Sequence, residues 1–460
     1  MARIQDIPVD SSEFPFNVAH TCELWRDVVL ECPENWINLE FDLAYDPHPL
    51  LDAIAASKTL LFSVHVFTTA NELTEARKLL ENKRARAVVQ SLLVHAERCT
   101  SIFFDLTYAS SLTSPALFLA RIHPELTELI LDYASYDLPR CYEGTQIKSK
   151  PIPLPLKKLR RMSMCGSAFM DIIHLGTEWL HAQSGSNQVR SRAEITIPTL
   201  HLRDFEFPAC NDEMIDKEYT FARFIHLLHF IVPWDRLHFE TISLAYRPHS
   251  DVRAAGQHDL EYADWSSLTL ENVSRDFITE FFQIGNLDSV EYLYFISCSV
   301  PPISGGFFCA NLSLSDAPVG GASFSDNDDS LYNLLSSWKG SSLALTACPT
   351  FDDKFIHWLA DDRGDGECEA YGIRFLDLKD CQNFTASALR RLVAAINDPV
   401  KLDDENWDEF EHMETLTVYG RGPRLTDEDL LWFNDYSGET SVTWHVENDD
   451  GYTINQKFGR

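Results

Sequence analysis

Three groups of polar residues have the types and spacings that metal binding would require. His226 and His229 stand three residues apart beside an apolar helical face, but the glutamate of a His-Glu-x-x-His zinc site is missing. Asp361–Gly366 has acids at positions one and five and glycine at position six of a calcium loop, yet positions three and twelve carry arginine and glycine. Asp326–Asp329 precedes a helical segment, where acids cap the N-terminus. We therefore predict no metal site.

The sequence also carries none of the motifs that mark phosphate binding or nucleophilic catalysis. It has no Gly-rich phosphate loop and no nucleophile elbow. Its eleven cysteines are scattered without a CxxC pair. An odd number of such cysteines in a long chain is typical of small buried residues in a reducing compartment, not of a disulfide framework. We expect no cofactor and no catalytic residue; an enzyme whose site is invisible in one sequence is the alternative. Several cysteines stand at positions of an apolar repeat: Cys99, Cys298, Cys309, Cys348 and Cys381.

The composition restricts the partners of the chain. Its 460 residues have a formal net charge of −32, and residues 361–460 alone hold 23 acidic against 10 basic side chains. A nucleic acid is disfavoured as the main partner, because phosphate binding requires a basic surface. The excess of acidic side chains either keeps the protein soluble or forms an acidic docking surface. No stretch approaches the roughly 18 apolar residues of a membrane span. The first twenty residues lack the apolar region of a signal peptide. We therefore predict a cytoplasmic or nuclear protein without membrane contact.

A short apolar phrase recurs along the chain and defines the elements that would position functional residues. It has apolar residues at positions one, four and six, and it is clearest at 197–202, 265–270, 290–295 and 373–378. Weaker copies begin at residues 99, 126, 159, 239, 309, 340 and 413, and segments of helical periodicity lie between the copies. The pattern L-x-x-L-x-L is the strand half of a leucine-rich repeat. We therefore predict an α/β solenoid, a horseshoe with parallel strands on its concave face and helices on its convex face.

The alternation within each phrase predicts which side chains are buried and which are offered to a partner, because successive side chains of a strand point to opposite faces. Ordinary solvated strand positions are the alternative for the outward set. Positions four and six are expected in the core, namely Leu200, Leu202, Leu268, Leu270, Leu376 and Leu378. Outward positions on the strands or just past their ends are expected to form a concave binding face for a protein partner: Arg161, Arg203, Asp204, Tyr246, Tyr292, Tyr294, Phe375, Asp377 and Lys379.

The N-terminal residues differ from the repeat. Residues 21–30 form a short helix candidate that Pro33 ends, and Trp25 and Trp36 are expected to pack together in one small core. Residues 71–98 form a longer helix candidate with a basic face. Turn-forming and charged residues predict inserted loops at 141–155, 183–194 and 248–259. The expected parts are a segment at 1–45, a connecting strand and helix at 46–98, an irregular repeat region at 99–440 and an acidic C-terminal tail at 441–460.

Several of these segments resemble the large fungal F-box-like family. Cys22 with Trp25-Arg26-Asp27, followed by Cys32-Pro33 and Trp36, matches the end of that family's F-box in residue type and spacing. Leu92–Cys99 resembles the family's L-L-x-H-x-x-R-W phrase, which opens its repeat region, and Ile373–Leu389 resembles the cysteine-containing repeats of F-box proteins. The proline-containing start and first apolar helix of an F-box are missing or diverged at residues 4–9, so the likeness begins at Cys22.

The resemblance implies a role in ubiquitin conjugation. F-box proteins are substrate-recognition subunits of SCF-type cullin–RING ubiquitin ligases, in which the F-box binds a Skp-type adaptor and the repeats hold a target protein. Such a subunit is not itself an enzyme, because it acts by holding the target near the conjugating enzyme. The alternative is a leucine-rich-repeat interaction scaffold without a ubiquitin-ligase link, which the missing first helix favours. The adaptor-binding residues that the resemblance implies are Trp25, Val28, Val29, Pro33 and Trp36.

Overall fold

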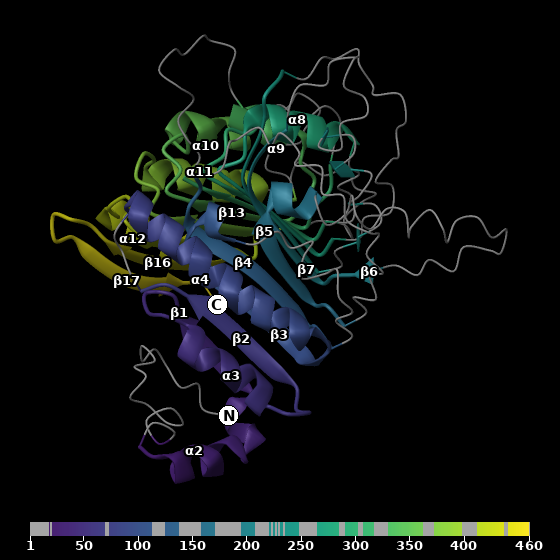
Figure 1. Cartoon of the computed structure of the whole chain (residues 1–460). Helices are drawn as coiled ribbons and strands as arrows, with labels where there is room; N and C mark the ends of the chain where they lie inside the picture. Colours follow the sequence, from purple (N-terminus) through teal and green to yellow (C-terminus); the bar gives the residue numbers. More distant parts are fainter. Residues whose placement is uncertain are drawn as a thin grey trace, which may run out of the picture. The chain divides into compact units, whose positions relative to one another are not determined.

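The chain divides into two compact units, residues 1–234 and 235–460. Each is an α/β unit built on an open, mostly parallel sheet (Figure 1), so the predicted fold class is confirmed at this level. The loops predicted at 141–155, 183–194 and 248–259 lie outside the described residues. The computed structural model describes residues 18, 21–69, 73–112, 125–137, 158–170, 195–207, 220–221, 224–225, 228, 231–232, 235–247, 265–284, 290–301, 307–316, 330–361, 372–397, 412–436 and 440–459.

In the first unit, six parallel strands follow the order β1-β2-β3-β4-β5-β7. Helix α3 packs against β1 and helix α4 against β3. The strands are β1 Asn38–Asp42, β2 Phe62–Phe67, β3 Cys99–Tyr108, β4 Glu128–Ser135, β5 Arg161–Cys165 and β7 Thr199–Phe207, and β6 Ile195–Thr196 pairs separately with β8 Ile231–Val232. The helices are α2 Glu23–Leu30, α3 His48–Ala56 and α4 Glu75–Val94, with short 3₁₀ turns η1 Pro33–Trp36, η2 Ala96–Arg98 and η3 Ala109–Ser111.

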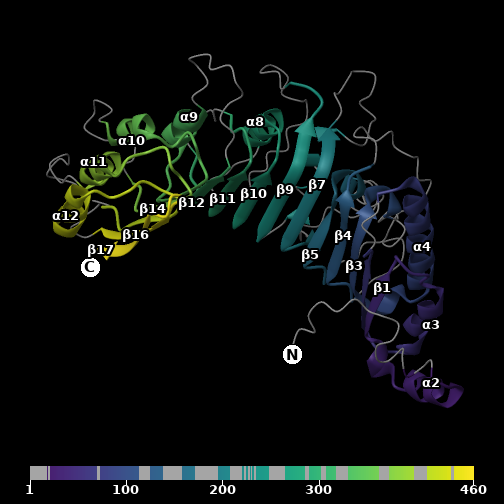
Figure 2. The same cartoon turned by 90° about the vertical axis from the view of Figure 1, so that its left-hand side faces the viewer.

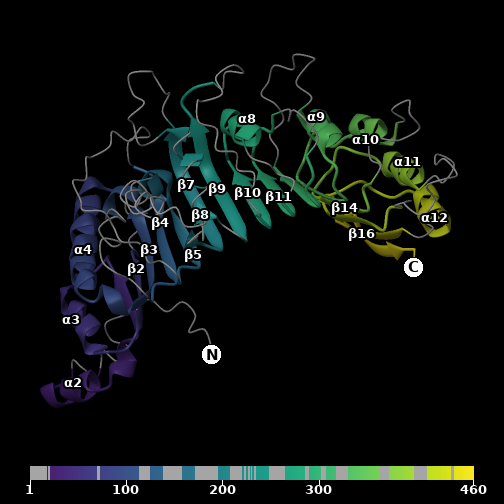
Figure 3. The ribbon, with the colours of Figure 1, turned by 90° about the vertical axis from the view of Figure 1, so that its right-hand side faces the viewer.

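In the second unit, eight strands from β9 to β16 run parallel in chain order, and β17 closes the row antiparallel to β16. Figures 2 and 3 show the described helices of this unit on one side of its strands. The strands are β9 Arg236–Leu244, β10 Ser267–Glu271, β11 Tyr292–Ile296, β12 Asn311–Ser315, β13 Ser342–Thr346, β14 Phe375–Lys379, β15 Thr415–Gly420, β16 Ser441–Glu447 and β17 Thr453–Phe458. The helices are α8 Arg275–Ile284, α9 Ser330–Ser337, α10 Asp353–Ala360, α11 Ala386–Ile396 and α12 Asp427–Tyr436.

Three boundaries drawn from the sequence need correction. The predicted C-terminal tail is wrong, because Ser441–Glu447 pairs with β15 and residues 453–458 pair back onto it. The parallel row begins at Asn38, since β1 pairs with β2 and β2 with β3. The phrase assigned to residue 239 starts earlier, because Leu237 is the residue in register with Leu268. All three boundaries are determined by strand pairing with residues remote in the sequence, which the local apolar pattern does not reveal.

The burial predicted for phrase positions four and six is confirmed. The six leucines named for these positions are completely buried. Neighbouring strands stack the same phrase position, so that Leu343, Leu376 and Leu416 are in register on β13, β14 and β15. Parallel pairing in register therefore converts a repeat in the sequence into one continuous apolar layer.

A left-handed residue stands at phrase position eight, two residues after the second buried position. Its φ angle is between 48° and 54° at every non-glycine residue of this set, and 73° at Gly420. The left-handed conformation redirects the chain at the end of each phrase, and Asn, Asp and Gly adopt it most easily. The members are Asp204, Thr241, Asn272, Ser297, Asp316, Ala347, Asp380 and Gly420.

Ala347 provides a test of this conformational requirement. A Cβ at its φ of 49° costs roughly 1–2 kcal/mol, whereas glycine adds only about 0.4–1 kcal/mol of entropy to the unfolded chain. We expect Ala347→Gly to raise the free energy of unfolding by up to about 1 kcal/mol, measured by urea denaturation. In the control Ala344→Gly, within β13, the same exchange should lower it by about 0.5–1 kcal/mol. A loss of stability in both variants would contradict the assignment.

Buried cysteines occupy phrase position nine and join neighbouring repeats. The thiols of Cys298, Cys348 and Cys381 donate to the position-six carbonyl of the preceding strand over 3.2, 3.4 and 3.6 Å. Burial raises the pKa of the Cys298 thiol to about 11, and that of Cys309 to about 12. These thiols stay protonated at neutral pH and serve packing rather than nucleophilic chemistry, as predicted for the cysteines of the repeat.

Candidate functional site

The short helix α2 exposes an apolar face. Leu24, Trp25 and Val28 are 71%, 50% and 46% exposed, although each is a large hydrophobic residue. Val28 is four residues after Leu24 and three after Trp25, so the three side chains share one side of the helix. Trp25 and Val28 also line a hollow of about 420 Å³ together with Val29 and Cys32. A contiguous apolar face of this kind is typical of a protein-binding surface.

The expected pairing of Trp25 with Trp36 in one core is wrong. Trp36 is 2% exposed, and its indole Nε1 donates a hydrogen bond of 3.1 Å to the carbonyl of Val29. Val29 is also buried, and Pro33 opens the turn η1 that brings Trp36 under the helix. Trp25 stands one turn before Val29 on the helix, but half of its side chain is exposed, so it lies outside this core. Of the five residues assigned to adaptor binding, Trp25 and Val28 are exposed, Pro33 is half-buried, and Val29 and Trp36 support the helix from below.

The second candidate surface is the strand face of the second unit that lies opposite its helices (Figures 2 and 3). Tyr292 and Tyr294 stand on β11, and Asp377 and Lys379 stand on β14. Their positions alternate with the buried leucines, so their side chains point away from the core. Tyr292 is 37% exposed, and Lys379 is exposed as well. Phe375 precedes them on β14 and is half-buried.

Sequence reasoning missed Tyr419 on this same face. It is in register with Lys379, and the Lys379 ammonium nitrogen lies 5.7 Å from the centroid of its ring. Tyr419 is 36% exposed and occupies position seven of the phrase that starts at residue 413. The repeat pattern itself could have identified it, because Lys379 occupies position seven of its own phrase.

Arg203 makes contacts within the first unit and is not available as an exposed binding residue. Its guanidinium carbon lies 4.0 Å above the ring of Tyr133, and Nη2 donates to the Tyr133 carbonyl over 2.5 Å. The Tyr133 hydroxyl donates to Asp204 over 2.7 Å, and burial raises the pKa of that phenol, which keeps it protonated. The Arg203 side chain is 14% exposed. Residues about seventy positions apart in the chain thus tie β4 to β7, whereas Arg161 at the start of β5 is exposed.

The assignment of Tyr246 to the concave face is wrong. Its hydroxyl donates a hydrogen bond to the carboxylate of Glu280 on α8, which belongs to the helical side of the unit. Burial raises the pKa of Glu280, and the bond from Tyr246 acts against that rise. Tyr246 follows the last residue of β9 by two positions, where the two-residue alternation of a strand no longer applies.

Ser163, His201 and Asp132 have the residue types of a hydrolytic triad but not its geometry. Ser163 Oγ lies 3.2 Å from Asp132 Oδ1 and 3.2 Å from His201 Nδ1. In a working triad the histidine stands between the serine and the carboxylate. Here the serine stands between the other two and is buried. The three residues hold neighbouring strands together and offer no activated nucleophile.

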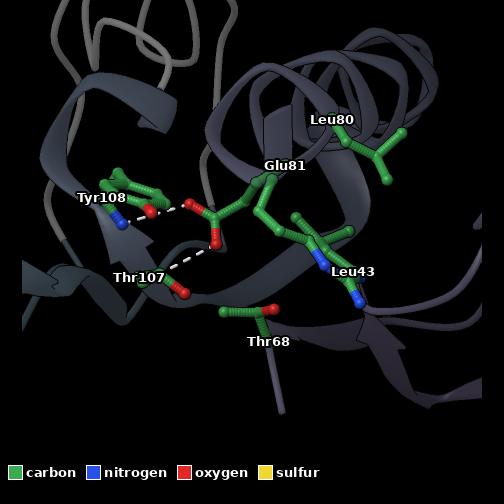
Figure 4. A pocket seen from close by; sticks show the side chains of 7 residues that line it. Leu43, Thr68, Leu80, Glu81, Thr107 and Tyr108 are labelled. Carbon is green, nitrogen blue, oxygen red and sulfur yellow. Dashed lines mark hydrogen bonds between the residues drawn. The ribbon is translucent and has the colours of Figure 1, made fainter. Parts of the chain in front are cut away.

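A small cavity beneath α4 is likewise structural. The Glu81 carboxylate accepts hydrogen bonds from the backbone amides of Thr107 and Tyr108, both over 3.1 Å (Figure 4). The adjoining volume is about 10 Å³, room for one water molecule at most. Arg84 on the same helix donates to the carbonyls of Leu43 and Ala44. The basic face predicted for this helix thus includes a side chain that anchors it to the end of β1.

The structure identifies no metal centre or membrane span in the part of the chain that it describes. No three His, Cys, Asp or Glu side chains among these residues are placed to share a metal ion. No described helix has both the length and the apolar character that a bilayer requires. Asp361 pairs with Arg391 over 2.6 Å, while His226, His229, Asp326–Asp329 and residues 362–366 lie outside the described residues. Comparison with protein-family models, curated proteins and solved structures found no match.

Proposed function

We propose that this chain is a substrate-recognition subunit of an SCF-type ubiquitin ligase, with no catalytic residue of its own. The apolar face of α2 carries the proposal, because Trp25 and Val28 are exposed there in the segment that resembles the end of an F-box. A Skp-type adaptor would cover this face, and a target protein would bind the uncovered strand faces. The subunit would act by raising the concentration of target lysines near the conjugating enzyme.

The energetics of α2 support a docking role. An eight-residue helix has little stability of its own in water, and it is held here by Val29 and the Trp36 indole. Tryptophan is among the residues most enriched at the energetic centres of protein interfaces. Leu24 and Val28 flank Trp25 on the same face, so a partner would bury three large apolar side chains at once.

We also propose that the strand units are leucine-rich repeats that form a horseshoe. Three regular features of the described residues support this assignment: buried positions four and six, a left-handed residue at position eight, and bridging cysteines at position nine. A rigid parallel sheet with one uncovered face suits the binding of an extended protein surface.

Adaptor capture tests the proposal directly. A purified Skp-type adaptor is titrated against the full chain, and the affinity is measured by calorimetry. Trp25→Ser with Val28→Ser is expected to weaken binding about tenfold or more, because the apolar contact of two exposed side chains is lost. Since both side chains are exposed, the urea midpoint should change little.

Leu431→Ser on α12 is the control, since it removes an exposed large apolar side chain far from α2 in the sequence. It should leave adaptor affinity unchanged. If the wild-type chain did not bind the adaptor, the ligase proposal would fail and a repeat scaffold without a ligase would replace it. Equal losses in the α2 and α12 variants would also count against the proposed face.

A further inference from the structure

The excess negative charge is concentrated in the second unit. Residues 235–460 hold 40 Asp and Glu against 16 Lys and Arg, whereas residues 1–234 hold 30 against 22. The second unit therefore carries a net charge of −24 out of −32. Such a field attracts cationic partners and repels anionic ones.

Two tyrosines on the uncovered face of this unit are each paired with carboxylates. Tyr292 donates a hydrogen bond to Glu291, which raises the pKa of the phenol. Tyr419 lies near Asp377 and Asp380, and burial together with these carboxylates raises its pKa as well. An exposed aromatic face beside a carboxylate attracts a guanidinium or ammonium group through both the ring and the charge.

The protein already places a cation on one of these tyrosines. The Lys379 ammonium occupies the ring of Tyr419 at 5.7 Å. The ring is thus oriented to accept a cation from the uncovered face, and an incoming side chain would replace Lys379. By contrast, the described cation–π pair of Arg203 and Tyr133 in the first unit is largely buried.

The distance between the two tyrosines sets the length of a ligand that reaches both. Tyr292 is on β11 and Tyr419 is on β15, four strand spacings away, which amounts to about 19 Å across the sheet. Thr415 is the residue of β15 level with Tyr292, so Tyr419 is also four residues further along, about 13 Å, and the direct distance is about 23 Å. Of the strands between them, β12 and β13 present small side chains to this face, including Ser313, Ala344 and Thr346, whereas β14 presents the larger Phe375, Asp377 and Lys379. An extended segment that crosses the strands obliquely covers that distance in roughly seven residues, and residues eight apart point to the same side.

We propose that the uncovered face of the second unit binds an extended, arginine- or lysine-rich segment of a partner protein, with one cation at Tyr292 and Glu291 and another at Tyr419 beside Asp377 and Asp380. This inference names the class of target protein that the proposed ligase subunit would recognise, and its role in ubiquitin conjugation rests on that proposed function. The binding itself requires no adaptor, so the two proposals are tested independently.

The probe is a fluorescently labelled serine-rich peptide with two arginines about eight residues apart, measured by anisotropy against the full chain. A peptide of identical composition with adjacent arginines is its control. We expect the spaced peptide to bind about fivefold more tightly, because only this peptide reaches both tyrosines. Tyr292→Ser and Tyr419→Ser should each remove most of that difference. Lys379→Ala should strengthen binding about threefold by vacating the Tyr419 ring.

Charge-matched variants separate this face from the general charge of the chain. Asp377→Lys should weaken binding about fivefold, whereas Asp435→Lys on α12 should change it less than twofold. Lys354→Ala on α10 is the corresponding control for Lys379→Ala. Equal effects at the face and at these controls, or equal affinity for the two peptides, would overturn the proposal, as would the absence of binding. If the chain bound the spaced peptide but not the adaptor, this inference would stand and only the proposed role in a ubiquitin ligase would fail.

Discussion

Phe281→Ala is expected to lower the free energy of unfolding by about 3–5 kcal/mol, the largest loss among the substitutions considered for this chain. Phe281 is completely buried on α8 at the centre of an aromatic cluster. Its ring stacks on Phe277 with a centroid distance of 5.6 Å and on Trp265 at 5.7 Å. It also meets the edge of Phe239 on β9 at 5.4 Å. Alanine would leave a cavity that three large rings cannot fill without moving.

Urea denaturation followed by tryptophan fluorescence measures this loss, with Trp265 as a reporter next to the substitution. Phe308→Ala is the matched control, because it removes the same side chain from an exposed position. Its effect should stay within about 0.5 kcal/mol. A small effect at Phe281 would mean that α8 does not pack on β9 in solution, and the assignment of one helical layer to this unit would fall with it.

Leu376→Ala should cost about 2–5 kcal/mol. Leu376 is completely buried on β14 and is in register with Leu343 on one side and Leu416 on the other. Its removal opens a gap in the middle of the apolar layer, and the paired strands on both sides limit how far that gap can collapse. The midpoint of thermal unfolding, with the heat of unfolding from calorimetry, provides the measurement.

Thr417→Ala on the neighbouring strand is the control for this substitution. Thr417 points to the opposite face, between Leu416 and Val418, and its loss should change stability by less than about 0.5 kcal/mol. The contrast tests the two-residue alternation on which the repeat assignment depends. Comparable losses at Leu376 and Thr417 would show that the alternation does not govern burial in this sheet.

Much of the strand architecture could be predicted from the recurring phrase. A strand alternates its side chains with a period of two, so the spacing of apolar residues at positions four and six determines which of them share a face. Helix starts follow local rules as well: Thr385 caps α11 by accepting a hydrogen bond from the backbone amide of Ala388, and Thr426 exchanges hydrogen bonds with Asp429 at the start of α12. Both rules depend on residues within a few positions of each other.

The candidate sites were predicted less completely, because their environments depend on remote residues. Trp25 and Trp36 are equally apolar, yet only Trp36 finds a buried carbonyl partner, at Val29. Arg203 occupies an outward-pointing position, but its guanidinium donates a hydrogen bond to the backbone carbonyl of Tyr133, seventy residues earlier. Tyr246 follows its strand closely and still turns toward Glu280 on α8.

The sequence by itself thus determined the period of the strands, the direction of their side chains and the identity of the buried leucines. The tertiary structure alone decided where the parallel row begins and ends, which outward side chains remain exposed, and which face of α2 is left uncovered. The physical reason is the range of the interactions. Side-chain direction follows from local backbone geometry, whereas exposure depends on which distant segments pack against a residue, and no local pattern encodes those neighbours.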